Sequence, residues 1–175
     1  EIVLRSRQFC NLSEAIARPG DTYGELSRKL RIATICGSLQ ATLTDFRYLS
    51  SAWRQNSEDE RLLGVSITGW YDCPWLRNAS ESDLKKLRAE VVETNKELAK
   101  KLKINQSAAT TCVKPSGTVS QLSGSASGCH PKYAPFYYRR VRNDIKDPIT
   151  DALMEAGVPH TIDPYNSEAM VFTFA

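Results

Sequence analysis

Two long amphipathic helix patterns, separated by a strand pattern, constrain the fold of this chain more than any other feature. Each predicted helix, over residues 22–41 and 80–102, begins with a Ser or Thr and has an acidic residue three positions later. This spacing is typical of a capping box, and apolar residues then recur at helical intervals. Between the helices, residues 62–70 alternate between apolar and small polar side chains, which predicts a strand.

The remaining patterns extend this alternation along the chain. Further strands are predicted over residues 1–12, 110–113, 136–142 and 169–174, and a helix over 147–156. Strands that alternate with helices indicate parallel strands joined by helical crossovers. We therefore expect an α/β fold.

Some local features give weaker expectations. Residues 46–60 and 71–78 are predicted to be irregular. Cys36 lies on the apolar stripe of its helix, which predicts a buried packing role. The helix over 80–102 carries lysines mostly off its apolar stripe, which predicts a solvated face. These lysines are Lys85, Lys86, Lys96, Lys100 and Lys101.

Composition excludes several classes of protein. With 175 residues the chain is long enough for one sizeable core. A net charge of +3 gives no polyanion-binding surface, so direct nucleic-acid binding is not expected. No apolar run approaches the roughly 20 residues of a membrane helix. The five cysteines are an odd number, and neither CxxC nor HxxxH occurs. We therefore expect reduced thiols in a cytoplasmic protein without a protein-ligated metal.

The stretch over residues 109–131 carries the clearest chemical signal. A short β-branched run breaks at Pro115 and Gly117, and Ser116, Thr118 and Ser120 supply hydroxyl groups. A turn of this kind before a helix suits a phosphate group, because backbone N–H groups and hydroxyls can point at the anion. An ordinary Ser/Gly turn remains the alternative at this point. The neighbouring pair Cys129-His130 is interpreted as structural, because adjacent residues seldom face one another productively.

Both ends of the chain lie in strand patterns, and no initiator Met is present. Bare apolar strands at a terminus are aggregation-prone, so this pattern predicts a piece of a larger protein.

Several stretches, taken in order, resemble ribonucleotide reductases, and the adenosylcobalamin-dependent (class II) enzymes most closely. The resemblance extends over nearly the whole chain. It is carried by Glu1-Ile2-Val3-Leu4, Phe9-Cys10-Asn11-Leu12, Leu62-Leu63-Gly64-Val65-Ser66-Ile67-Thr68-Gly69, Lys114-Pro115-Ser116-Gly117-Thr118-Val119-Ser120, Tyr137-Tyr138-Arg139-Arg140-Val141-Arg142 and Val171-Phe172-Thr173-Phe174.

The resemblance implies a fold and its boundaries. The family's catalytic domain is a ten-stranded α/β barrel of two five-stranded halves. Residues 1–175 would be a single partial domain, the second five-stranded half, with alternating strands and helices. The radical cysteine, the effector site and the second redox cysteine would then lie outside these residues. The chain alone would be inactive for that reason.

The resemblance also assigns roles to individual residues. Glu1 would be the base for the 3′-hydroxyl of a ribonucleotide, and Cys10 would be one of two thiols that supply electrons. Without the resemblance, Glu1 would be a surface charge and Cys10 a buried packing residue. The substrate-phosphate loop would consist of Pro115, Ser116, Gly117, Thr118 and Val119.

Cofactor and partners follow from the same resemblance. They are adenosylcobalamin, a ribonucleoside di- or triphosphate, a thioredoxin-like reductant and the remainder of the catalytic chain, with no membrane. A diiron-dependent class I enzyme shares the barrel and the Glu and Cys roles, so the cofactor class stays open here. The alternatives to a reductase are a phosphate-binding α/β module without chemistry and a purely structural α/β domain.

Overall fold

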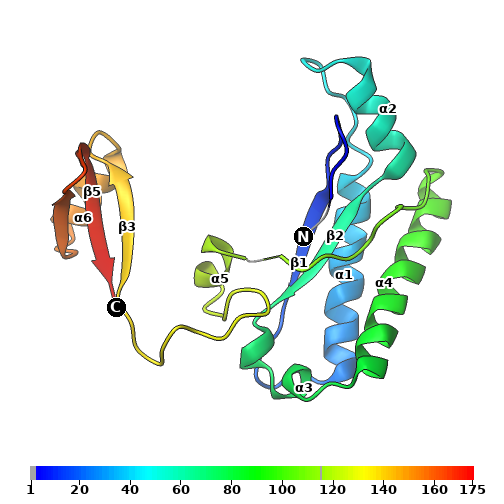
Figure 1. Cartoon of the computed structure of the whole chain (residues 1–175), viewed down its shortest axis with the longest axis horizontal. Coiled ribbons are helices and arrows are strands. Elements are labelled where there is room, and N and C mark those ends of the chain that lie inside the picture. Colours follow the sequence, from blue (N-terminus) through cyan, green and yellow to red (C-terminus); the bar gives the residue numbers. More distant parts are fainter. Residues whose placement is uncertain (1–2, 115) are drawn as a thin grey trace. The chain divides into compact units, whose positions relative to one another are not determined.

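The computed structural model describes residues 3–114 and 116–175. The chain forms two compact units, Glu1–Lys132 and Tyr133–Ala175, called unit 1 and unit 2 below. Each unit has its own sheet, and the two are described separately (Figure 1).

Unit 1 is built on two parallel strands, β1 (Asn11–Ile16) and β2 (Leu63–Thr68). Asn11 is paired with Leu63, and Ile16 with Thr68. On the other side of β2, Thr111 forms an isolated parallel bridge with Val65. The helices of unit 1 are α1 (Tyr23–Gln40), α2 (Ser51–Glu60), α3 (Pro74–Arg77), α4 (Glu81–Leu102), α5 (Thr118–Leu122) and the 3₁₀ turn η1 (Trp70–Asp72).

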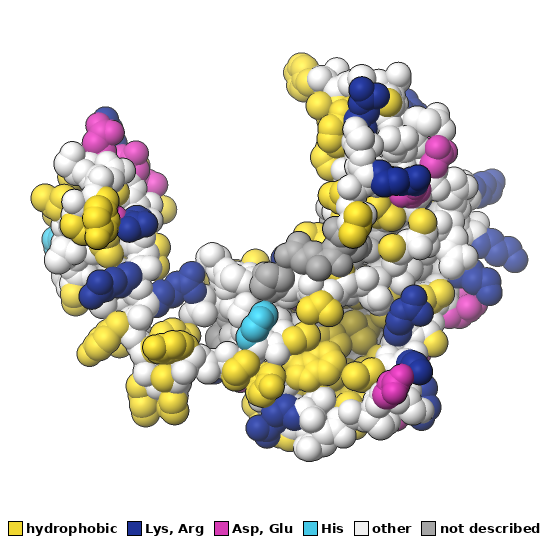
Figure 2. Space-filling view, in the orientation of Figure 1, with side chains coloured by type: hydrophobic (Ala, Val, Ile, Leu, Met, Phe, Trp, Pro, Cys, Tyr) yellow, Lys and Arg dark blue, Asp and Glu magenta, His cyan; other side chains and the backbone are white. Residues whose placement is uncertain are grey.

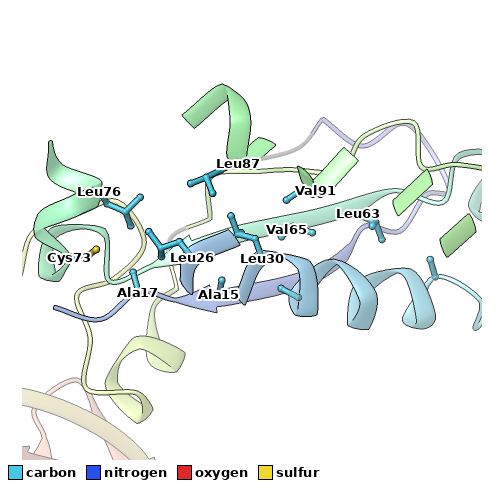
Figure 3. Packing of buried hydrophobic residues seen from close by; sticks show 12 residues of the cluster. Ala15, Ala17, Leu26, Leu30, Leu63, Val65, Cys73, Leu76, Leu87 and Val91 are labelled. Atoms are coloured by element: carbon cyan, nitrogen blue, oxygen red, sulfur yellow. The ribbon is translucent and has the colours of Figure 1, made fainter. Parts of the chain in front are cut away.

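The core of unit 1 lies between this strand pair and the two long helices (Figure 3). Helix α1 packs on β1 and β2, and α4 packs along α1. Because Leu26 and Leu30 are one helical turn apart, they face the sheet together and contact the cluster of Leu63 and Val65. Val91 of α4 packs in the same cluster. The helix face predicted to be apolar is therefore the one that is buried.

The opposite face of β2 carries the small residues Gly64, Ser66 and Thr68. Side chains alternate along a strand, so this face points away from α1. Ser66 and Thr68 are nevertheless buried. This face is therefore covered by other parts of unit 1.

Unit 2 is a three-stranded antiparallel sheet with one helix. It contains β3 (Arg139–Asp144), α6 (Pro148–Glu155), β4 (His160–Asp163) and β5 (Asn166–Phe174). The strand order is β3-β5-β4 (Figure 1). Its buried apolar side chains come from β5, with Phe172 and Met170 almost inaccessible to solvent.

The structure confirms an α/β fold but not the predicted barrel half. The described residues contain five strands, and these form two small sheets rather than one. The prediction of parallel strands holds for β1 and β2 and is wrong for β3 and β5, which pair antiparallel. Strand β4 was not predicted, and it also pairs antiparallel with β5. Two residues join β4 to β5, a connection too short for the crossover that parallel strands need. That residues 1–175 form one partial domain stays a prediction.

The structure also differs from the sequence predictions in three smaller features. Residues 46–60, predicted to be irregular, contain α2, and its Trp53 packs against the ring of Phe9 with 4.7 Å between ring centroids. Residues 110–113, predicted as a strand, contribute one isolated bridge. Cys36 is exposed rather than buried, because the buried stripe of α1 runs through Ala33 and Gly37.

The polar face predicted for the second long helix is confirmed. All five of its lysines are exposed on α4, and Lys and Arg side chains line the outer side of this helix (Figure 2). In the part of the chain that the structure describes, no helix has the length and apolar character of a membrane span.

Candidate functional site

The candidate site lies on the face of β1 and β2 that is turned away from α1. Cys10 precedes β1, and Glu14 follows it on the same side at strand spacing. Gly64 and Thr68 of β2 lie on the same face, and the loop after residue 113 brings Ser116 onto it. The face therefore combines a thiol, a carboxylate and hydroxyl groups from segments far apart in the sequence.

Cys10 is partly buried beside Gly64. A Cβ atom built on Gly64 would lie 3.1 Å from the Cys10 Sγ and 3.0 Å from the Cys112 Sγ. Burial, with a smaller contribution from Cys112, raises the pKa of the Cys10 thiol to about 11. At neutral pH this environment keeps Cys10 protonated.

Cys112 is a neighbour of Cys10 and not a ready disulfide partner. Cys10 precedes β1, whereas Cys112 follows the residue that pairs with the other side of β2. Two strand spacings separate such positions by about 9.5 Å, and a disulfide tolerates about 7 Å between Cα atoms. In the described chain none of the five cysteines forms a disulfide. The electron-donating partner of Cys10 is therefore not supplied by Cys112 in this conformation.

Ser116 is buried, and its hydroxyl group points inward. The Ser116 hydroxyl contacts the Oε1 atom of Glu14 and lies 2.7 Å from the Thr68 Oγ1. Thr68 in turn accepts the N–H of Gly128 at 2.8 Å and donates to the carbonyl of Ala126 at 3.0 Å. Thr68 thus connects both ends of the loop over residues 116–128 to β2.

Three further residues of the predicted phosphate loop, Gly117, Thr118 and Val119, are exposed. Gly117 has φ +52 and ψ −120, a conformation that a side chain would strain, although a Cβ there would meet no atom within 4 Å. Its N–H donates to the Ser127 Oγ at 3.1 Å. Thr118 and Val119 begin α5 and face solvent. Gly117, Thr118 and Val119 therefore form the outer surface of the loop.

Two predicted site residues, Glu1 and Pro115, lie outside the described residues. Their roles stay predictions.

The sequence interpretation missed Glu14. Its Oε2 atom is buried and has no hydrogen-bond partner among the described residues. Glu14 lies four residues after Cys10, so strand alternation placed both on one face, and that signal was available. Its contact with Ser116 joins residues 102 positions apart and has no counterpart in any local pattern.

The pair Cys129-His130 shows no mutual contact that would make it a catalytic pair. The His130 Nδ1 lies 3.2 Å from the carbonyl of Ser127, and burial raises the pKa of the Cys129 thiol. Within the residues that the structure describes, no three His, Cys, Asp or Glu side chains gather as metal ligands would.

Comparison with known proteins identifies relatives over nearly the whole chain. An adenosylcobalamin-dependent ribonucleoside-triphosphate reductase of Lactobacillus acidophilus is 28% identical over 99% of this chain. The enzyme of the same name from Lactobacillus gasseri is 38% identical over 93% of this chain. The predicted resemblance to class II ribonucleotide reductases is confirmed. No protein-family model matches the chain.

The fold of the chain matches part of the fold of a solved class II reductase. The crystal structure of a B-12-dependent (class II) ribonucleotide reductase matches 99% of this chain with a TM-score of 0.72 and 24% identity. This chain spans about a quarter of its relatives, 27% of the Lactobacillus acidophilus reductase and 26% of the Lactobacillus gasseri reductase.

The relatives depend on adenosylcobalamin, as predicted, and no cavity described in unit 1 is large enough to hold the corrinoid by itself. Three cavities have volumes of about 250, 460 and 570 Å³. Volumes of this order suit drug-sized ligands rather than a corrinoid with its adenosyl group. We assign the corrinoid to no described residue of this chain.

Proposed function

We propose that this chain contributes to the active site of an adenosylcobalamin-dependent ribonucleotide reductase and acts on a ribonucleoside triphosphate. The likeness to reductases of that name over nearly the whole chain supports the reaction class. One observation carries the site: Cys10 and the loop anchored through Ser116 are on the same face of β1 and β2.

The reaction needs three contributions. A radical at the 3′ carbon activates the sugar, a base removes the proton of the 3′-hydroxyl, and two thiols supply two electrons. The 2′ oxygen leaves as water, the 2′ carbon gains hydrogen, and the two thiols become a disulfide. A thioredoxin-like dithiol then returns that disulfide to two thiols. When bound in the complete enzyme, adenosylcobalamin supplies the radical.

Cys10 is proposed as one of the two reducing thiols. Its raised pKa, about 11, keeps the sulfur protonated at neutral pH, and a protonated thiol is the form that donates hydrogen to a substrate. The second thiol belongs to a part of the enzyme beyond these residues. Glu1 is proposed as the base, on the resemblance.

The loop over residues 115–119 is proposed to hold the substrate's phosphates. Gly117, Thr118 and Val119 face solvent, and the Thr118 hydroxyl can be presented to an anion. The N–H groups of Gly117 and Val119 already donate within the loop region, to the Ser127 Oγ and the Ser116 carbonyl. The loop lies beside the strand that Cys10 precedes, so a nucleotide bound here by its phosphates would have its ribose directed along this face.

The test is ribonucleotide reduction by the complete protein. We expect turnover with adenosylcobalamin and a dithiol, and none with an iron-radical partner. Activation by the iron-radical partner would overturn the class assignment. The Cys10→Ser variant should lose multiple turnover, whereas Cys36→Ser, which removes an exposed thiol on α1, should keep it. Unchanged turnover in Cys10→Ser would overturn the redox role.

A phosphate-binding module without chemistry is separated from an enzyme by Glu1→Gln. If the chain acts in catalysis, this variant binds nucleotide and loses reduction. Unchanged turnover would contradict the role of Glu1 as base.

A further inference from the structure

The side chain of Glu14 contacts hydroxyl groups of two other segments of unit 1. Glu14 extends from β1 toward the loop, and its Oε1 atom accepts the hydroxyl of Ser116. The Ser66 Oγ lies 3.4 Å from the same oxygen. Glu14 therefore links β1, β2 and the loop.

The hydroxyl protons of Thr68 and Ser116 are both used in hydrogen bonds within the protein. The Thr68 hydroxyl donates to the Ala126 carbonyl at 3.0 Å, and its oxygen accepts the Gly128 N–H at 2.8 Å. Ser116 has one hydroxyl proton and lies between Glu14 and Thr68, which are its two acceptors. That proton is therefore used inside the protein.

Ser116 cannot serve the substrate without giving up this arrangement. Its side chain is 5% exposed, and its hydroxyl oxygen is enclosed by Glu14 and Thr68. A phosphate that took the Ser116 proton would leave the Glu14 Oε1 atom with only the longer contact to the Ser66 hydroxyl, at 3.4 Å, which is costly. The Oε2 atom of Glu14 already has no partner among the described residues.

We propose that Glu14 and Thr68 are positioning residues that latch the loop to the sheet through Ser116. Ser116 is then the anchor of the loop, and Gly117, Thr118 and Val119 are its ligand-binding surface. The phosphate class of the ligand rests on the proposed function; the latch itself rests on the hydrogen bonds alone.

The latch is tested by hydrogen–deuterium exchange of residues 116–123 in the complete protein. Glu14→Ala should raise the exchange rate of these amides about tenfold, the equivalent of one buried hydrogen bond. Glu14→Gln should keep the protection, because its amide oxygen still accepts the Ser116 hydroxyl. Glu93→Ala, which removes an exposed carboxylate of α4, is the control and should change nothing.

Steady-state kinetics separate positioning from catalysis. Glu14→Ala should raise the KM for the nucleoside triphosphate about tenfold and change kcat much less, and Glu14→Gln should restore the KM. The double variant Glu14→Ala/Ser116→Ala should be no worse than Ser116→Ala alone, because Ser116→Ala already removes the contact with Glu14. Unchanged protection of helices α1 and α4 shows that each variant is folded.

The outcomes distinguish the latch from the proposed function. Unchanged exchange of residues 116–123 in Glu14→Ala would overturn the latch, as would additive effects of the two substitutions. Raised exchange with an unchanged KM would support the latch and contradict the proposed phosphate-binding role of the loop.

Discussion

The Cys10 thiol lies in an environment that opposes its ionisation. Burial is the larger cause, and the nearby Cys112 adds to it, so that the pKa rises from 9.0 to about 11. The neutral thiol is favoured by folding, which contributes stability below pH 9. That contribution is lost as the pH rises from 9.0 toward 11, because the unfolded chain then ionises first.

Replacement of Cys112 should change the reactivity of Cys10. In Cys112→Ser the like charge is removed, so we expect the alkylation rate of Cys10 to reach its midpoint at a lower pH. Because burial remains, the midpoint should stay above 9.0. The measurement is iodoacetamide labelling of Cys10 between pH 7 and 11, followed by mass spectrometry. A midpoint equal to that of the parent protein would contradict the coupling between the two thiols.

The lack of a side chain at Gly64 leaves room for the sulfur atoms of Cys10 and Cys112. A Cβ at this position would lie 2.5 Å from the Leu12 Cδ2 and 3.0 and 3.1 Å from the sulfurs of Cys112 and Cys10. We expect Gly64→Ala to lower the free energy of unfolding by about 1 kcal/mol, since Leu12 is partly exposed and can move. It should also shift the Cys10 alkylation profile.

The control for Gly64→Ala is Gly24→Ala, at an exposed position where the nearest atom to the added Cβ lies 4.0 Å away. Denaturant unfolding measures both variants. Equal stability of Gly64→Ala and the parent, with unchanged labelling of Cys10, would show that the two sulfurs do not depend on this glycine.

At the scale of elements, the carboxylate of Asp163 links β4 to β3 in the sheet of unit 2. Asp163, at the end of β4, is almost fully buried. Its Oδ1 accepts the N–H of Tyr165 at 2.8 Å, and its Oδ2 contacts Arg142 of β3. The Tyr165 N–H first, and Arg142 in addition, hold the pKa of Asp163 below its usual value of 3.8.

Unit 2 should therefore lose stability in acid through this group. The stabilisation is present above pH 3.8 and is lost as the pH falls through the lower pKa of the folded state. We expect Asp163→Asn to reduce the protection of β4 and β5 against hydrogen exchange at pH 6. The control is Glu168→Gln, an exposed residue paired with Lys146 at 3.3 Å. Equal protection in the two variants would contradict the role of Asp163.

Helix α2 is an element that its own sequence did not predict. Eight of its ten residues are polar, and none of the ten is buried. The helix forms where Trp53 packs on Phe9, a residue more than 40 positions earlier. No periodicity within residues 51–60 contains that information.

On the scale of the molecule, unit 2 begins with an exposed aromatic segment, residues 133–138 (Figure 2). Tyr133 is 92% exposed and Phe136 is 94% exposed, and the segment has no regular structure. Irregular exposed segments are the preferred sites of proteolysis.

Brief chymotrypsin treatment of the 175-residue chain should therefore cut at Tyr133, Phe136 or Tyr138, and also at Tyr48, which is 99% exposed. Tyr23 should be spared, because its ring packs on Trp75 with 5.7 Å between ring centroids. Mass spectrometry of the first fragments identifies the bonds cut. Early cleavage at Tyr23, or none within residues 133–138, would contradict the described exposure.

The sequence by itself predicted α1, α4 and β2, because capping and hydrophobic periodicity are local properties. It also predicted the resemblance to class II reductases from the order of short motifs. It predicted parallel strands in unit 2, where β3 and β5 are antiparallel. Cys10 was named from that resemblance, whereas the loop over residues 115–119 was first proposed as a phosphate site from its turn residues and then from the resemblance. Their roles stay predictions.

Only the tertiary structure decided what Ser116 does. Its hydroxyl contacts Glu14, 102 positions earlier, and Thr68, 48 positions earlier. Those contacts depend on the register of β1 on β2 and on the path of the loop across them. The physical reason is that side-chain alternation places a residue on a face, whereas pairing between distant strands decides which residues meet there.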